Sequence, residues 1–195
     1  KSVKDMQNIT PLVAQEGEEW QPYARDIKRL ARKHAIPGTP GLEHRLGGLE
    51  KDGLTGNVSY DPDNHEAMCK VRKEKIEKIT NFIPKQEIFG DEKGDLLVVG
   101  WGGTYGSLYT AVKEMRLEGK DISLAHFNYI NPLPRNTGEI LSKYNKIVVC
   151  EINNGQFVNL LRMSRSDFKY EQFNHIQGLP FLTSELKEHF NTLLS

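Results

Sequence analysis

Residues Gly94–Gly106 read GDLLVVGWGGTYG, and this stretch decides the fold. It begins with an unbroken apolar run that closes on a glycine, which is typical of a buried strand. A helical pattern follows directly over Thr104–Leu117, with one apolar face formed by Leu108, Ala111, Val112 and Met115. A buried strand that passes into an amphipathic helix is the first half of a βαβ unit, so the stretch predicts a parallel sheet.

The same alternation continues to the end of the chain. Apolar runs predict further strands at Asp121–Phe127, Lys146–Cys150 and Tyr170–Ile176, with a turn over Asn131–Pro134. Helical periodicity predicts helices at Thr137–Lys143, Gly155–Met163 and Ser184–Leu194. We therefore predict that residues 94–195 form an α/β domain whose parallel sheet is covered on both faces and has its own core.

Residues 1–83 have a different character. Glycine and proline crowd residues 8–60, and no strand–helix repeat is visible. Two interpretations are open: a disordered tail, or ordered loops packed against a polypeptide outside this chain. We favour the second because the segment is too apolar for a solvated tail. Its large apolar residues are Trp20, Tyr23, Ile36, Leu42, Leu46 and Leu49.

One helix is predicted in this first part, over residues 62–82. Asp61 can cap its first turn, Pro62 suits the first helical position, and Pro84 ends it. A stripe runs through Met68, Val71 (or Arg72), Ile76, Ile79 and Ile83, while the charged residues of 70–78 suit a solvated face. We interpret this helix as the connector between a loop-rich extension and the α/β domain.

Composition excludes several classes of protein. The 26 basic and 26 acidic residues cancel, so no electrostatic feature favours nucleic acid or an anionic membrane as a partner. No apolar run reaches the ~20 residues of a membrane helix, and no signal peptide is visible. Cys69 and Cys150 are too few for a four-thiolate cluster, and they suit a reduced, cytoplasmic setting. The chain starts at Lys1 without Met, which suggests a piece of a longer polypeptide.

The glycine-rich turn after the first strand has two interpretations. Its position, between a strand and a helix, suits a dinucleotide site. The spacing is G-x-G-x-x-x-G, however, and the second strand ends in residues 126–128 (HFN) without the acid that would hold a ribose. We therefore favour a structural role, in which the glycines let strand and helix approach closely and make room for Trp101.

Candidate binding residues lie in the loop Ala35–Gly48. Thr39, His44 and Arg45 could together bind a carboxylate or a phosphate, although such clusters more often hold a loop in place. Residues 126 and 150–151 (His, then Cys-Glu) are predicted at the carboxyl edge of the sheet, where α/β proteins tend to bind ligands. We interpret the cysteine there as a small buried apolar residue. No complete catalytic set and no metal-ligand spacing is visible.

Several motifs, taken together and in order, resemble the α subunits of 2-oxoacid:ferredoxin oxidoreductases, of the 2-oxoglutarate type. They cover most of residues 20–181, and their combination is far more specific than any single one. The motifs are AIPGTPGLEHRLGGLE (35–50), TGNVSYDPDNH (55–65), GDLLVVGWGGTYG (94–106), NYINPLP (128–134), the stretch 151–161, and GLPF (178–181).

The resemblance implies a heteromeric enzyme that oxidatively decarboxylates a 2-oxoacid, transfers the acyl group to coenzyme A and reduces ferredoxin. A β subunit of that family holds thiamine diphosphate, Mg²⁺ and a [4Fe–4S] cluster. Residues 1–83 match the tail of the pyrimidine-binding domain plus the connector helix, and residues 94–195 match a domain that resembles the transketolase C-terminal domain. The chain is expected to bind no cofactor and to be inactive alone.

The resemblance also ranks the site residues. Thr39 is expected near the 2-oxoacid pocket as a substrate contact, followed by Arg45 and His44, and no catalytic residue is expected in the chain. Lys33-His34 stands where related sequences often carry arginine or an aromatic residue, which leaves the partner of the distal carboxylate open. Two alternatives remain: a non-catalytic α/β module for subunit contacts, or a nucleotide-binding domain.

Overall fold

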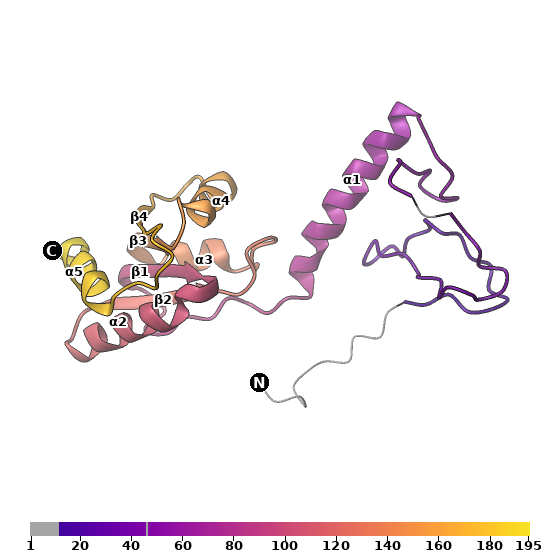
Figure 1. Ribbon diagram of the computed structural model, residues 1–195. Coiled ribbons are helices and arrows are strands. Elements are labelled where there is room, and N and C mark those ends of the chain that lie inside the picture. The colour runs from indigo at the N-terminus through magenta and orange to yellow at the C-terminus, as the bar shows by residue number, and fades with distance from the viewer. Residues whose placement is uncertain (1–11, 46) are drawn as a thin grey trace. The chain divides into compact units, whose positions relative to one another are not determined.

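The computed structural model describes residues 12–45 and 47–195 (Figure 1). The chain divides into two compact units, the first reaching to Ile79 and the second spanning Thr80–Ser195. Residues 1–11 of the predicted extension, and Leu46 among its apolar residues, lie outside the described part.

The second unit is built on a four-stranded, all-parallel sheet with the order β2-β1-β3-β4. The strands are β1 (Gly94–Trp101), β2 (Ile122–Phe127), β3 (Tyr144–Glu151) and β4 (Glu171–Asn174). Val98 of β1 lies in register with Leu124 of β2 on one side and Val148 of β3 on the other. The prediction of a parallel α/β sheet is confirmed.

Helices cover both faces of this sheet, because neighbouring residues of a buried strand point to opposite sides. Leu96 and Val98 share one core cluster with α2 (Tyr105–Leu117) and α5 (Thr183–Leu194). Leu97 and Val99 share the other with α3 (Thr137–Leu141) and α4 (Gln156–Ser164). The predicted inward face of α2 is fully buried. The larger side chains of that face, Leu108, Val112 and Met115, each contribute roughly 1.5–3 kcal/mol to folding.

The turn from β1 into α2 needs glycine at only some of its positions. A Cβ on Gly100 would lie 2.2 Å from Leu108 Cδ1 and 2.8 Å from Thr104 Oγ1, so this glycine does allow strand and helix to approach. Gly102 has a φ of 59°, which glycine adopts most easily. A Cβ on Gly103 or Gly106 would meet nothing within 4 Å. The predicted role in close packing is therefore confirmed for Gly100 and wrong for these last two.

The first unit consists mainly of loops followed by α1 (Pro62–Lys78), which continues as the 3₁₀ turn η2 (Ile79–Asn81). The side chain of Asp61 caps α1 by accepting a hydrogen bond of 3.0 Å from the Asp63 backbone N–H, as predicted. In the predicted apolar stripe Met68 is buried, but Ile76 and Ile79 are 42% and 38% exposed. The helix is confirmed, while the described residues cover its apolar stripe only in part.

Short bridges and ion pairs order the loops of the first unit. Isolated β-bridges join Val13 to His34, Arg25 to Arg32 and Lys51 to Val58. The charged face of α1 carries i,i+4 ion pairs, for example Lys70–Glu66 at 2.6 Å, in agreement with a solvated face. Within the described ranges, no helix is both long enough and apolar enough to cross a membrane.

Candidate functional site

Two consecutive turns shape the loop that carries Thr39. The backbone N–H of Thr39 donates to the Ile36 carbonyl at 3.1 Å, and that of Leu42 donates to the Thr39 carbonyl at 3.3 Å. Each turn has proline at its second position and glycine with positive φ at its third, with φ of 91° at Gly38 and 76° at Gly41. Proline followed by such a glycine is the signature of a type II turn, so the sequence PGTPG fixes the loop without regular structure.

The Thr39 side chain lies between these two turns. Its hydroxyl donates to the Ile36 carbonyl at 2.9 Å, which holds the side chain in place. A hydroxyl held by a single backbone carbonyl can turn to donate to an incoming carboxylate instead, because its proton rotates freely about the C–O bond.

The Trp20 ring positions His44 beside this loop. The two rings make an edge contact with centroids 4.8 Å apart, and His44 Nδ1 lies 3.0 Å from the Leu42 carbonyl oxygen. Leu42 itself is buried at 5% exposure and anchors the second turn. A ring nitrogen next to a carbonyl oxygen carries the proton, so the structure favours the tautomer with hydrogen on Nδ1.

Thr39 and His44 line one cavity of about 430 Å³ in the first unit. Trp20, Arg32 and His34 also line this cavity, so its lining combines an aromatic ring with hydrogen-bond donors. Arg45 does not line it. Of the three residues predicted to form a site, the structure therefore brings two together and leaves the third outside. Sequence alone could not reveal Trp20, which is 24 positions from His44.

One cation of this wall is already neutralised. Lys33 forms an ion pair with Glu18, and the hydrogen bond from Lys33 is the main cause that lowers the pKa of the Glu18 carboxyl. Arg32 instead stacks over the Tyr23 ring, with its guanidinium carbon 4.1 Å from the ring centroid. A guanidinium stacked on an aromatic face keeps its N–H groups free for an anion.

The carboxyl edge of the sheet in the second unit holds a buried carboxylate. Glu151 has no solvent exposure. Its Oε1 accepts from Trp101 Nε1 at 3.0 Å and from the Phe157 backbone N–H at 2.8 Å, and its Oε2 accepts from the Val158 N–H at 3.0 Å. All three bonds are structural: they close the N-terminus of α4 and hold the indole, so the carboxylate is not free for a ligand.

His126 lies near the end of β2 at the same edge, as predicted. Its Nε2 is buried without a hydrogen-bond partner among the described residues, and the ring packs edge-on against Tyr105 with centroids 5.0 Å apart. Burial lowers the pKa of the imidazole below its usual value, so the ring is neutral at pH 7. An isolated neutral histidine here gives no catalytic arrangement.

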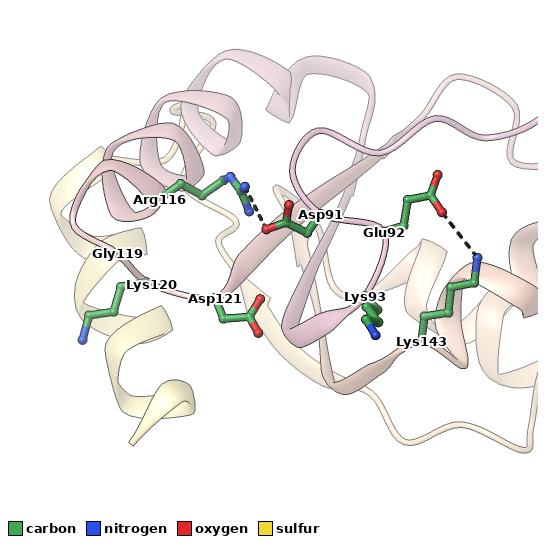
Figure 2. Close-up of a pocket in the computed structure, with 8 residues that line it drawn as sticks. All are labelled: Asp91, Glu92, Lys93, Arg116, Gly119, Lys120, Asp121 and Lys143. Atoms are coloured by element: carbon green, nitrogen blue, oxygen red, sulfur yellow. Dashed lines mark hydrogen bonds and ion pairs between the residues drawn. The ribbon is translucent and has the colours of Figure 1, made fainter.

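A second cavity, about 770 Å³, lies at the amino end of the same sheet, where the strands begin (Figure 2). Two ion pairs lie in its lining: Arg116 reaches Asp91 at 3.0 Å, and Lys143 reaches Glu92 at 4.0 Å. Parallel α/β sheets bind ligands at the opposite, carboxyl edge. We interpret this cavity as a structural junction between the loop 91–93 and the sheet.

Neither cysteine is paired. Cys150 is fully buried, and burial raises the pKa of its thiol, as expected for a small apolar core residue. Cys69 is exposed on α1. Residues 12–45 and 47–195 contain no cluster of His, Cys, Asp and Glu side chains that could hold a metal ion.

Comparison with known proteins gives a consistent result. No family model matches the chain. It is 45% identical over 165 residues to the 2-oxoglutarate oxidoreductase subunit KorA of Mycobacterium tuberculosis, a match that covers 82% of this chain and 25% of that subunit. It is 30% identical over 104 residues to the alpha subunit of 2-oxoacid:ferredoxin oxidoreductase 1 of Aeropyrum pernix, covering 50% of this chain and 16% of that subunit.

A solved structure is similar over almost the whole chain. It is the 2-oxoglutarate:ferredoxin oxidoreductase from Magnetococcus marinus with 2-oxoglutarate, coenzyme A and succinyl-CoA bound. The match has a TM-score of 0.88 and 25% sequence identity, and covers 98% of this chain and 34% of that one. The chain thus spans about a quarter to a third of the relatives it matches most extensively.

Proposed function

This chain is homologous to part of the α subunit of 2-oxoacid:ferredoxin oxidoreductases, and on that basis we propose that it serves in a heteromeric enzyme of this kind. The enzyme decarboxylates 2-oxoglutarate, or a related 2-oxoacid, transfers the acyl group to coenzyme A and passes electrons to ferredoxin. The observation that carries the proposal is the 45% identity to KorA across 82% of the chain.

The role we propose for this chain is to hold substrate, not to perform the bond cleavage. The cavity that contains Thr39 and His44 offers a hydroxyl and an imidazole in one wall, with Arg32 beside them. The Thr39 hydroxyl and the Arg32 guanidinium suit a carboxylate of the 2-oxoacid, because each can direct an O–H or N–H at an anionic oxygen. His44, whose Nδ1 proton is directed at the Leu42 carbonyl, is proposed to shape the same wall. Arg45, outside this cavity, is a candidate for an outer contact only.

The cofactors of the reaction are proposed to come from residues outside this chain. Two cysteines cannot supply the four thiolates of a [4Fe–4S] cluster, and one of them is buried in the core of the second unit. The described residues therefore do not fit the cluster. Thiamine diphosphate, which supplies the electron-accepting ring when bound, and its Mg²⁺ are proposed to be held by the β subunit together with the cluster.

A substitution at Thr39 tests the substrate role. In the assembled enzyme, Thr39→Ala removes the hydroxyl and is expected to lower kcat/KM for 2-oxoglutarate by roughly tenfold, the effect of losing one hydrogen bond to a charged group. Thr39→Ser keeps the hydroxyl and serves as the matched control. An alanine variant with the kcat/KM of the wild type would remove Thr39 from the site.

A binding measurement tests the division of labour between subunits. The isolated chain is expected to show no saturable binding of thiamine diphosphate in a calorimetric titration with Mg²⁺ present. The same titration on the assembled enzyme is expected to saturate at one cofactor per active site. Tight binding by this chain alone would contradict the proposal.

A second candidate role is a non-catalytic module for subunit contacts, confined to the second unit. Its loop 175–182 carries apolar side chains that the described residues leave open: Ile176, Leu179 and Leu182 are 65%, 63% and 60% exposed. Exposed apolar residues this close together are common at protein interfaces. Leu179→Ser with Leu182→Ser is expected to weaken assembly, measured by analytical ultracentrifugation. Complexes that still form and keep normal turnover would favour this role for the unit.

A further inference from the structure

A third cavity, in the first unit, has a composition unlike the other two. It measures about 700 Å³ and lies between the loop 48–51, the bridged segments around Arg25 and Arg32, and one side of α1. Five cationic side chains line it against one carboxylate: Arg25, Arg32, Lys51, Arg72 and Lys75, against Glu50. Concave sites of this size hold small molecules.

Lys51 is the most informative of these residues. It is only 3% exposed, although lysine is almost never buried to this degree without a partner. Its backbone is fixed by the bridge to Val58 and by a 2.9 Å hydrogen bond from Asn64 Nδ2 to its carbonyl. Among the residues that the structure describes, its ammonium group has no ion pair and no hydrogen bond. Lys51 also lines the cavity, so an anion bound there would supply the partner that its ammonium group lacks among these residues.

The one carboxylate of the lining, Glu50, forms an ion pair with only one of the other cations. Glu50 binds Arg72 with two hydrogen bonds, of 3.2 and 3.4 Å, and also contacts His65 at 2.7 Å. This leaves Lys75 without an ion pair among the described residues. Arg25 Nη1 donates a hydrogen bond of 3.3 Å to the Leu30 carbonyl. Its pKa is lowered by burial first, and then by the positive charges of Arg32 and Arg72, which shows that like charges converge here.

From this geometry we propose that the cavity binds an anion that carries two phosphoryl groups. Five cations against one carboxylate leave four positive charges, and an anion with two phosphoryl groups would balance most of this charge. Guanidinium forks and ammonium groups are the side chains that bind phosphate oxygens best. A single carboxylate would leave most of the charge unbalanced.

The proposed anion site shares one residue with the proposed substrate cavity. Arg32 lines both this cavity and the one that contains Thr39, whereas Lys51 and Lys75 line only this one. A test that uses those two lysines therefore reports on the anion site and leaves the proposed substrate site intact.

The experiment measures how fast individual lysines are acetylated in the full-length, assembled protein loaded with its cofactors. Sulfo-NHS-acetate modifies the lysines and mass spectrometry quantifies each position, with and without inorganic pyrophosphate. Pyrophosphate is expected to slow acetylation of Lys75 at least fivefold. Lys73, on the same helix but paired with Glu77 at 3.7 Å and outside the cavity, is the matched control and is expected to keep its rate.

Variants then connect the protection to the buried lysine. Lys51→Met is expected to raise the pyrophosphate concentration for half-protection of Lys75 by about tenfold, the effect of one lost charge-assisted hydrogen bond. Arg25→Gln provides the same comparison if the methionine variant does not fold. Replacing pyrophosphate by coenzyme A identifies the source: equal or better protection assigns the cavity to the phosphates of coenzyme A, and weaker protection assigns it to another phosphorylated ligand.

The proposal is overturned if pyrophosphate does not slow the acetylation of Lys75. It is also overturned if it slows Lys75 and Lys73 equally, because the anion would then act on the surface in general. The proposal is likewise overturned if Lys75 is acetylated slowly even without pyrophosphate and pyrophosphate does not change its rate. Acidic side chains of a neighbouring polypeptide would then occupy the cavity.

Discussion

A carboxylate without contact to water is stable only when its oxygens accept hydrogen bonds, and Glu151 meets this condition with three donors. Two of these donors are the backbone N–H groups at the start of α4, which have no partner within the helix. The third comes from Trp101, 50 positions earlier in the chain. One side chain therefore ties the end of β3 to the end of β1 and to α4.

Replacement of this carboxylate is expected to destabilise the second unit. Glu151→Gln keeps the shape of the side chain but turns an N–H₂ group toward a backbone donor, which leaves buried groups unpaired. We expect a loss of about 2 kcal/mol, measured by urea unfolding followed by circular dichroism. Glu139→Gln, in an exposed i,i+4 pair with Lys143, is the control and is expected to change stability far less. Equal effects would contradict the structural role.

The hydrogen bonds of Glu50 lead us to expect that the stability of the first unit depends on pH. Hydrogen bonds from Arg72 first, and then from His65, lower the pKa of this carboxyl from 4.5 to about 2. Because the pKa of Glu50 is lower in the folded state than in the unfolded state, its carboxylate contributes fully to the stability of the first unit above pH 4.5. This contribution is lost as the pH falls through 2, because the proton then binds the folded state as well.

The backbone amide of Ser59, which donates to the Glu50 carbonyl at 3.0 Å, reports on this link. At pH 5 its hydrogen exchange is expected to be slower in the wild type than in Glu50→Gln. Near pH 2 the two proteins are expected to exchange equally. The ratio at each pH cancels the intrinsic pH dependence of exchange, and the amide of Ala111 in α2 serves as the internal control. A ratio that stays constant across this range would contradict the assignment.

At the level of elements, we expect two glycines at the junction of β1 and α2 to respond differently to substitution by alanine. Gly100→Ala places a methyl group 2.2 Å from the Leu108 side chain and is expected to cost about 1–3 kcal/mol through overpacking. Gly103→Ala meets nothing within 4 Å and is expected to be nearly neutral. Thermal unfolding of the two variants measures the difference, and an equally destabilised Gly103→Ala would show that strain in the turn, not packing, matters.

The elements of the second unit could be predicted because each buries an apolar face of its own. Boundaries were less certain: β3 begins at Tyr144 and not at Lys146, because Tyr144 pairs with Gly94 although the apolar run starts later. The edge strand β4 was predicted too long, at Tyr170–Ile176, since it pairs only with β3. Pairing between strands decides such ends, and no local pattern contains it.

The site was harder to predict than the fold. Thr39 and His44 share a motif that His34 directly precedes, so their proximity follows from sequence, whereas Trp20 reaches the same cavity only through the folding of the loops. The role of Glu151 was missed. An acid directly after a buried strand, six positions before the start of an apolar helical run, is the signal that could have found it.

At the level of the whole molecule, the two units are expected to differ in their independence. Thr80–Ser195 has two core clusters, one on each face of the sheet, and is expected to unfold cooperatively when expressed alone. Residues 1–79 leave Ile27 and Tyr60 89% and 87% exposed, and are expected to show no cooperative transition alone. Calorimetry of the two fragments checks both outcomes. A cooperative transition in the first fragment would contradict the view that a neighbouring polypeptide supports it.

The two tryptophans are divided between the units. Trp20 packs against His44 in the first, and Trp101 donates its indole proton to Glu151 in the second. Each unit therefore carries its own intrinsic fluorophore. In Trp20→Phe the remaining tryptophan fluorescence comes from the second unit alone, and in Trp101→Phe it comes from the first unit alone. Fluorescence spectroscopy can therefore follow ligand binding to one unit without a tryptophan signal from the other.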